Sequence, residues 1–213
     1  MLYAIGDIHG EYDMLLALYE KIRIHSRGEA STIVFLGDYV DRGQKSKQVL
    51  DFVMTEGRRN FSFVCLKGNH EQLMTEGSDM WLINGGRETK LSFVTPDNTD
   101  GLIPQKYIDW MKYLPTLYET EKFIFVHAGL SPGLTAQETS EAVRLWTRFE
   151  FLTSEYDWGK RVIHGHTPSR QVEVKPNRIN IDTGAVFYDT LTAVSLSAKE
   201  PEFIQVTRWE AAQ

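Results

Sequence analysis

Five short apolar runs, each followed at once by a polar motif, constrain the fold of this chain more than any other feature. They occupy residues 2–5, 33–36, 61–67, 123–126 and 161–163. The second run, IVFL, leads into GDYVDRG at 37–43, where two carboxylates and a guanidinium lie between two glycines. Such runs are typical of buried strands, and glycine lets the backbone turn sharply where a strand ends. This concentration of charge at a strand end suits a site for metal and phosphate better than a purely structural turn.

The residues able to bind metal or transfer protons follow these predicted strands. In open α/β folds the carboxyl ends of the strands meet at one crevice, where ligands bind. We therefore expect one site that collects the following side chains: Asp7, His9, Asp38, Asp41, Asn69, His70, His127 and His166. Five of the six histidines lie in the loops after the strands, and only His25 lies elsewhere.

The remaining stretches predict helices and one insertion. Apolar residues recur at helical spacing over 12–24, and 48–55 is a second predicted helix. Between 72 and 121, glycines and prolines interrupt short helical pieces such as 108–114, which predicts an inserted helical lid and not a separate domain. Three strand-like runs in the tail, 178–181, 192–196 and 202–207, are expected to form an antiparallel piece that closes the fold. We predict a single domain over residues 1–213, of the α/β (α+β) class.

The composition restricts the possible partners. With 42% hydrophobic and 24% charged residues, the chain can bury a full core. Its net charge of −6 argues against non-specific nucleic-acid binding, which needs a basic surface. A negative protein that handles anionic substrates must reverse the sign locally, and bound metal cations do so. The sequence shows no signal peptide, and no apolar run is long enough to span a membrane. We therefore predict a cytoplasmic protein without a membrane partner. The lone Cys65 is expected to be a buried small apolar residue.

The residue types at the strand ends favour a pair of metal ions. Two Asp, one Asn and three His form an oxygen and nitrogen set without thiolates, which suits manganese, iron or zinc. Six protein ligands are too many for one catalytic ion with an open position. They are natural for two ions about 3.5–4 Å apart that share a carboxylate and activate water for attack on phosphorus. Arg42 would bind phosphate oxygens, and His70, oriented by Asp41, would protonate a leaving group.

The motifs GDIHG at 6–10, GDYVDRG at 37–43, GNHE at 68–71, HAG at 127–129 and GHT at 165–167 carry a family resemblance. In this order they resemble the phosphoprotein phosphatase branch of the calcineurin-like metallophosphoesterases. Within the branch the chain is most similar to the bacterial and phage serine/threonine protein phosphatases of the lambda type, while symmetrical diadenosine tetraphosphate hydrolases share the motifs. The resemblance implies a central β-sandwich flanked by helices.

The resemblance also implies a role for each matching residue. Two metal ions would be held as follows: Asp7 and His9 on the first, Asp38 as the bridge, and Asn69, His127 and His166 on the second. His70 matches the general acid and Asp41 its partner. Arg42 matches a phosphate-binding arginine.

Some assignments stay open at this point. The family has a second phosphate-binding arginine, for which Arg148 is the best match and Arg144 a rival. His164 is an alternative ligand to His166, and the motif favours His166. Asp182, in a DTG sequence, resembles an aspartic-protease loop, but such proteases need two aspartates, so we expect it to support the metal site.

Three residues of the insertion also have two interpretations. Arg87 either brings a positive charge to the cleft or is an ordinary surface arginine. Trp81 and Trp110 are expected to pack in the core of the insertion and not to form a stacking platform.

The substrate is the least determined property. The candidates are a phosphorylated protein or peptide, a dinucleoside polyphosphate or other small phosphoester, and a metal-bound binding module without turnover. The His70–Asp41 pair argues against the last, because a binding module needs no general acid. Dinucleoside hydrolases of this family usually carry extra sequence after the last motifs, and this chain ends soon after its closing strands. The sequence therefore favours a serine/threonine, or dual-specificity, protein phosphatase.

Overall fold

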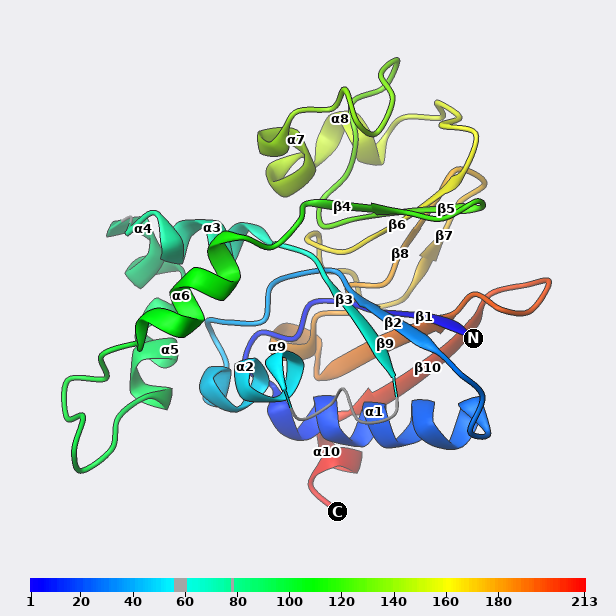
Figure 1. Ribbon diagram of the computed structural model, residues 1–213. Helices are drawn as coiled ribbons and strands as arrows, with labels where there is room; N and C mark the ends of the chain where they lie inside the picture. Colours follow the sequence, from blue (N-terminus) through cyan, green and yellow to red (C-terminus); the bar gives the residue numbers. More distant parts are fainter. Residues whose placement is uncertain (56–60, 78) are drawn as a thin grey trace.

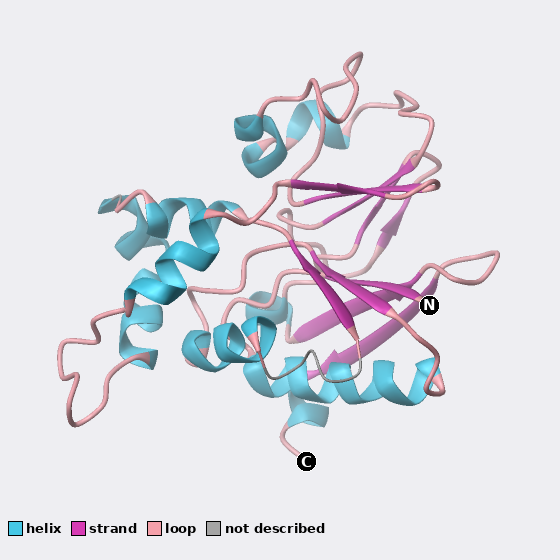
Figure 2. Cartoon of the chain, viewed as in Figure 1, coloured by secondary structure: helices cyan, strands magenta, loops and turns pink. Residues whose placement is uncertain are grey.

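Two mixed five-stranded sheets pack face to face, with helices on their outer sides (Figure 1, Figure 2). The computed structural model describes residues 1–55, 61–77 and 79–213, so residue 78 of the predicted insertion lies outside the described part. The predicted α/β class, with a central β-sandwich flanked by helices, is confirmed.

The first sheet has the strand order β10-β9-β1-β2-β3. Its strands are β1 (Leu2–Ile5), β2 (Thr32–Phe35), β3 (Ser62–Cys65), β9 (Thr190–Ser195) and β10 (Glu202–Thr207). Strands β1, β2 and β3 are parallel, because helices α1 (Tyr12–Ser26) and α2 (Ser46–Met54) carry the chain back between them. Their carboxyl ends therefore lie at the same edge of the sheet.

The second sheet has the order β4-β5-β6-β8-β7. Its strands are β4 (Leu117–Glu119), β5 (Phe123–Val126), β6 (Arg161–His164), β7 (Glu173–Val174) and β8 (Arg178–Asn180). Strands β5, β6 and β8 are parallel. The prediction of one antiparallel piece in the tail was therefore wrong for 178–181. Of the three predicted tail strands, β9 and β10 pair antiparallel with each other, whereas β8 lies in the second sheet, parallel to β6 and antiparallel to β7.

Side chains alternate along the strands between two cores. In β1, Tyr3 and Ile5 pack with Leu18 of α1, whereas Ala4 packs with Ile163 of the facing sheet. Successive side chains of a strand point to opposite faces, so a strand covered on both faces is apolar throughout. This explains why the sequence shows continuous apolar runs at these strands. Cys65 is buried, as expected.

The insertion is helical over most of its length. It contains α3 (Asn69–Thr75), α4 (Asp79–Trp81), the helical segment Leu82–Gly86, α5 (Arg87–Ser92) and α6 (Gln105–Lys112). Helix α6 begins three residues before the predicted 108–114. At the end of the predicted range 72–121, β4 pairs with β5 and so belongs to the second sheet. Phe93 and Tyr107 join the core of the first sheet, and Trp110 packs edge-on against Tyr39.

Four short helices complete the chain: α7 (Glu141–Trp146), α8 (Phe149–Leu152), α9 (Ala185–Tyr188) and α10 (Arg208–Ala211). Phe151 of α8 packs against Val162 on the outer face of the second sheet. Within the described residues, every helix is too short or too polar to cross a bilayer.

Candidate functional site

Strained turns build the crevice at the strand ends. Among the described residues, five of the seven non-glycine residues with positive φ belong to the predicted site: His9 at 46°, Asp38 at 53°, Asp41 at 73°, Arg42 at 69° and His166 at 66°. Each such conformation costs about 1–3 kcal/mol and persists only where the surroundings enforce it. Here the turns hold one another, because the His9 N–H donates to the Asp38 carbonyl at 2.9 Å and the Gly43 N–H to the His9 carbonyl at 3.0 Å.

Two motif glycines leave room for carboxylates. A Cβ on Gly68 would lie 2.1 Å from Oδ1 of Asp38, and one on Gly165 would lie 2.0 Å from Oδ1 of Asp7. Both distances are impossible for a side-chain carbon. The glycines are therefore required by the close approach of the acidic side chains.

Metal-binding side chains converge in two groups. The ligand atoms of His9, Asp38 and His70 lie within 4.8 Å of one another. Those of Asp38, His127 and His166 form a second group of the same kind. All of these residues are buried, and Asp38 belongs to both groups. A carboxylate thus lies between two sets of imidazoles.

The His127 imidazole directs a lone pair into this centre. Burial lowers the pKa of His127, so its ring carries one proton, which Nδ1 donates to the Leu36 carbonyl at 2.9 Å. Its Nε2 lone pair therefore lies 2.9 Å from Oδ1 of Asn69 and 3.5 Å from Oδ2 of Asp38. Acceptor atoms this close repel one another unless a cation lies among them.

His9 repeats this arrangement on the other side of Asp38. Burial holds the pKa of His9 well below its usual value, and its Nδ1–H donates to the Val40 carbonyl at 2.8 Å. Its Nε2 lone pair lies 3.4 Å from Oδ2 of Asp38 and accepts from Arg42 at 2.5 Å. The donor set of neutral imidazoles and a carboxylate fits divalent metal ions.

The nearby carboxylates strengthen this conclusion. Burial, with Asp182 and Asp38 close by, raises the pKa of Asp7 well above its usual value. Burial, with Asp38 adding to it, raises the pKa of Asp182 to about 7. Burial also opposes the charge on Asp38, but the imidazoles around it hold its pKa below the usual value. Three buried acids repel one another, and a divalent cation would relieve this repulsion.

Asp7 and Asn69, the other two predicted ligands, lie at the edges of the centre. The carboxylate of Asp7 accepts the His166 N–H, with oxygen distances of 3.0 and 3.2 Å. Oδ1 of Asn69 lies 2.9 Å from Nδ1 of His166. The structure thus brings all six predicted ligands together. It also places His70, predicted as the acid, in the group with His9.

His70 and Asp41 form the predicted pair. Nδ1 of His70 donates to Oδ2 of Asp41 at 2.7 Å, which leaves Nε2 for other partners. Burial disfavours the charged imidazole, but the carboxylates of Asp38 and Asp41 outweigh this effect and raise the pKa of His70. His70 is thus suited to carry a proton near neutral pH.

The insertion supports this pair in a way that sequence reasoning missed. Oδ1 of Asp41 accepts hydrogen bonds from Nε1 of Trp81 at 2.8 Å and from the hydroxyl of Thr89 at 2.7 Å. The Thr89 oxygen also accepts the Asp41 N–H at 2.8 Å. Trp81 is half-buried and packs against the core, as predicted, but its indole N–H has this additional partner. No spacing in the sequence could have indicated contacts between residues that lie 40 and 48 positions apart.

Glu71 is a second residue whose role was missed, although it belongs to the GNHE motif. It is fully buried and accepts four backbone N–H groups, from Gly68 at 2.9 Å, Asp38 and Tyr39 at 2.8 Å and Val40 at 3.4 Å. Burial, with Asp38 adding to it, raises the pKa of Glu71 to about 8, while these N–H groups oppose the rise. Glu71 therefore joins the turn after β2 to the start of α3.

The structure separates the two rival arginines. The guanidinium of Arg144 donates to the Thr139 carbonyl at 2.9 Å, the Thr116 hydroxyl at 3.0 Å and the Gln137 carbonyl at 3.1 Å. It is thus committed to the loop before α7. Arg148 is exposed. Burial lowers the pKa of both His127 and His166, and the charge of Arg148 adds to this effect. Arg148 is therefore the arginine whose charge is felt at the centre, and it stays the predicted phosphate-binding residue.

The alternative ligand His164 lies outside both groups of ligand atoms. It is fully buried, its ring packs edge-on against Phe151, and burial lowers its pKa to about 3. This arrangement favours a structural role for His164.

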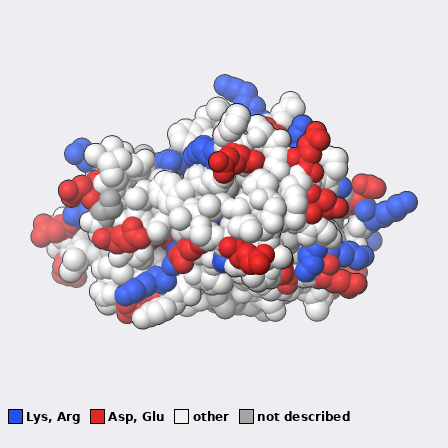
Figure 3. Space-filling model, turned by 90° about the horizontal axis from the view of Figure 1, so that it is seen from above, with Lys and Arg blue, Asp and Glu red and all other residues white. Residues whose placement is uncertain are grey.

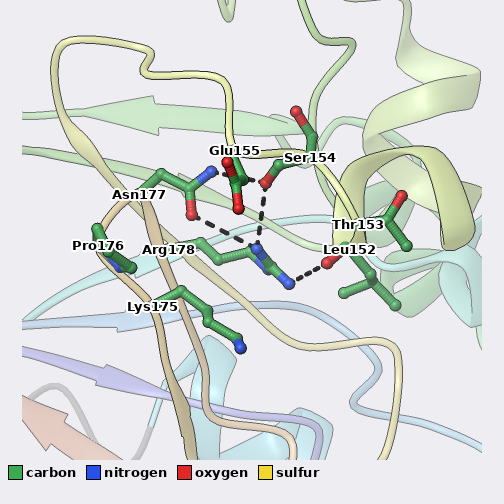
Figure 4. Close-up of a pocket in the computed structure, with 8 residues that line it drawn as sticks. All are labelled: Leu152, Thr153, Ser154, Glu155, Lys175, Pro176, Asn177 and Arg178. Atoms are coloured by element: carbon green, nitrogen blue, oxygen red, sulfur yellow. Dashed lines mark hydrogen bonds between the residues drawn. The ribbon is translucent and has the colours of Figure 1, made fainter.

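A second, polar pocket lies between residues 152–155 and 175–178, away from the metal-binding side chains (Figure 4). Arg178 donates to the carbonyls of Leu152 and Ser154 there, beside Asn177. Arg178 begins β8, whereas the metal-binding side chains follow the strands, so this pocket lies at the opposite edge of the second sheet. Its guanidinium closes the turn after α8 and contributes nothing to the site.

A β-sandwich with Asp, Asn and His at the ends of parallel strands, converging on a shared carboxylate, defines a metallophosphoesterase. The sequence model described as calcineurin-like phosphoesterase matches residues 2–194. The chain belongs to this family, whose members use divalent metal ions.

Curated relatives carry names of dinucleotide hydrolases. The bis(5'-nucleosyl)-tetraphosphatase PrpE [asymmetrical] of Anoxybacillus flavithermus is 28% identical over 91% of this chain and 90% of its own length. The protein of the same name from Bacillus velezensis is 30% identical over 88% and 86%. A symmetrical bis(5'-nucleosyl)-tetraphosphatase of Nitrosococcus oceani is 32% identical over 62% of this chain and 44% of its own length. Because this chain matches the asymmetrical relatives along most of their length, its length does not favour a protein phosphatase over a dinucleotide hydrolase.

Solved structures confirm the fold. A putative diadenosine tetraphosphatase superposes with a TM-score of 0.73 at 19% identity, over 97% of this chain and 94% of its own. A protein serine/threonine phosphatase from Saccharomyces cerevisiae with similarity to human phosphatase PP5 gives 0.63 at 15%, over 97% and 79%. At these identities the likeness concerns the fold alone.

Proposed function

We propose that this protein is a metal-dependent hydrolase of bis(5'-nucleosyl) tetraphosphates. The observation that carries the proposal is the pair of metal-binding groups that share Asp38. The dinucleotide substrate is supported by the names of the relatives that match along nearly their whole length. In the reaction, water adds to one phosphorus and the bridging P–O bond breaks, giving two mononucleotides.

Six residues would hold two divalent ions, manganese, iron or zinc: Asp7, His9, Asp38, Asn69, His127 and His166. When bound, such a pair supplies hydroxide at neutral pH and neutralises charge on the reacting phosphate. The Leu36 and Val40 carbonyls fix the tautomers of His127 and His9, so that each presents its Nε2 lone pair.

The chain's own groups handle the leaving phosphate. His70, held through Nδ1 by Asp41, would give a proton from Nε2 to the oxygen that leaves phosphorus. The guanidinium groups of Arg42 and Arg148 would bind phosphate oxygens, for which their planar geometry is suited.

A protein phosphatase is the second candidate, because the same site could act on phosphothreonine. The sequence favoured this substrate, but the argument from chain length no longer supports it. The face shown in Figure 3 carries acidic and basic side chains interspersed, and neither sign dominates it. Attraction of an anionic substrate would therefore depend on the centre itself and its arginines.

The test compares two substrates on chelator-stripped protein resupplied with Mn²⁺. We expect diadenosine tetraphosphate to be cleaved with at least tenfold higher kcat/KM than a phosphothreonine peptide, a difference of about 1.4 kcal/mol. Release of ATP and AMP would indicate asymmetrical cleavage, and release of ADP alone symmetrical cleavage. Faster hydrolysis of the peptide would refute the proposed substrate.

Matched histidine variants test the site. His70→Ala should abolish most turnover and leave the metal content unchanged. The control is His25→Ala, because His25 lies outside the site and bonds to Tyr3 and Glu202. Wild-type turnover in His70→Ala would show that the acid is another residue.

A further inference from the structure

A cavity of about 620 Å³ opens beside the centre, between the segment Leu82–Gly86 and helix α9. We infer that it binds one nucleoside of the substrate, with its base against Phe187 and its phosphates towards Arg42 and Arg87. This inference rests on the proposed dinucleotide hydrolysis. The cavity has the size of a small-molecule site and exceeds what a single phosphate needs.

Arg42 connects the cavity to the metal-binding residues. Its Nη1 lies 2.5 Å from Nε2 of His9, and its guanidinium lies 5.0 Å from the centre of the Phe187 ring. A ligand that stacks on Phe187 is therefore one side chain away from the centre. A phosphate attached to that ligand would reach Arg42 directly.

The cavity is lined by large apolar side chains that solvent still reaches. Phe187 is 53% exposed, Ile83 77% and Leu82 40%. Neighbouring exposed apolar side chains bordered by polar residues are typical of ligand-binding grooves. A flat aromatic ring beside an aliphatic side chain suits a purine or pyrimidine base, since every base has a face that stacks on aromatic rings.

The charges of the lining suit a nucleotide with several phosphates. Arg87 is exposed and has neither a hydrogen bond nor an ion pair with another described residue. The metal centre with Arg42 and Arg148 suffices for one phosphate, so Arg87 offers an additional cation for a longer chain of phosphates. Glu88 brings a carboxylate to the same lining, which is a suitable acceptor for ribose hydroxyls. A phosphopeptide would use the apolar wall but gives less reason for Arg87 as an additional cation.

The test measures binding of AMP and of inorganic phosphate to Mn²⁺-loaded protein by calorimetry. All variants carry His70→Ala, so that AMP is not turned over. Phe187→Ala should weaken AMP binding by about 5- to 150-fold, the size of one base–aromatic contact, and leave phosphate binding unchanged. The matched control is Phe203→Ala, because Phe203 is also exposed but lies on the outer strand β10. It should bind both ligands like the parent.

Two outcomes would overturn the inference. Unchanged AMP affinity in Phe187→Ala would exclude base stacking, and an equal loss for AMP and phosphate would mean that Phe187 only holds Arg42 in place. With His70 restored, Arg87→Gln should lower kcat/KM for diadenosine tetraphosphate more than for the phosphothreonine peptide. A larger loss for the peptide would assign the cavity to a protein substrate.

These measurements separate the two proposals. Failure of wild-type protein to hydrolyse the dinucleotide would refute the proposed function, while AMP binding would still decide the nucleoside subsite. Hydrolysis of the dinucleotide at equal rates by wild type and Phe187→Ala would refute the subsite alone.

Discussion

Replacing Thr89 by valine tests whether the insertion supports the acid pair. The fully buried hydroxyl of Thr89 makes two bonds with Asp41: it donates to Oδ1 at 2.7 Å and accepts the backbone N–H at 2.8 Å. Valine has nearly the same shape but neither donates nor accepts. Asp41 would keep the Trp81 N–H on Oδ1 at 2.8 Å and a longer bond from its N–H to Ser46 at 3.2 Å.

The expected loss follows from these contacts. A hydrogen bond to a charged group contributes about 1.5–3 kcal/mol, and the weakened N–H bond adds about 0.5–1 kcal/mol. The free energy of unfolding should therefore fall by about 2–4 kcal/mol, which lowers Tm by about 5–15 °C in a chain of this size. The kcat should fall as well, because Asp41 would hold His70 less firmly.

Urea unfolding of Thr89→Val beside Thr89→Ser provides the assay. Serine keeps the hydroxyl and loses one methyl group, which costs about 1 kcal/mol. Valine should thus be the less stable variant and the less active one, with unchanged metal content in both. Equal stability and equal kcat would show that the hydroxyl does not support Asp41.

Three further predictions concern the centre and its surroundings. Asp38→Asn should lower the metal content at both positions, measured by elemental analysis, and loss of a single ion would argue against a bridge. Arg148→Ala should weaken the binding of tungstate, a phosphate analogue, by about 10-fold or more and leave Tm unchanged. Arg144→Ala should mainly lower Tm. The reverse pattern would exchange the roles of the two arginines. The pKa of His164 is about 3 against about 6.5 in the unfolded chain, so the unfolded state binds the proton more tightly. As the pH falls from about 6.5 to about 3, protonation of His164 should therefore lower the free energy of unfolding of the metal-free protein by up to about 1.4 kcal/mol per pH unit. Above about pH 6.5 this residue should have no such effect. His164→Asn should show a shallower loss in urea titrations between these pH values, and an unchanged slope would refute the assignment.

The strands and their polar ends could be predicted from the sequence because both signals are local. An apolar run bounded by glycine defines a strand, and the residue after it is fixed at the strand's end. For this reason Asp38 and His127 were placed in one crevice, although they lie on different sheets.

The pairing of β8 and the contacts between distant segments could not be predicted, because they depend on tertiary packing and not on any local pattern. Strand β8 looks like β9 in sequence, and only the packing of the two sheets decides that it pairs with β6. The contacts of Trp81 and Thr89 with Asp41 cross from the insertion to the first sheet. Phe187 follows the DTG sequence closely, but its exposure beside Arg42 depends on how α9 packs.

The centre takes its residues from both sheets, and this has a consequence for how the molecule comes apart. Asp38 follows a strand of the first sheet, whereas His127 and His166 follow strands of the second. Ions bound there would cross-link the two layers in addition to the apolar contacts between them. Such ligands stabilise the folded state by mass action, so the separation of the layers should become the slow step of unfolding. Resistance to proteolysis would then rise and fall with the metal available to the protein.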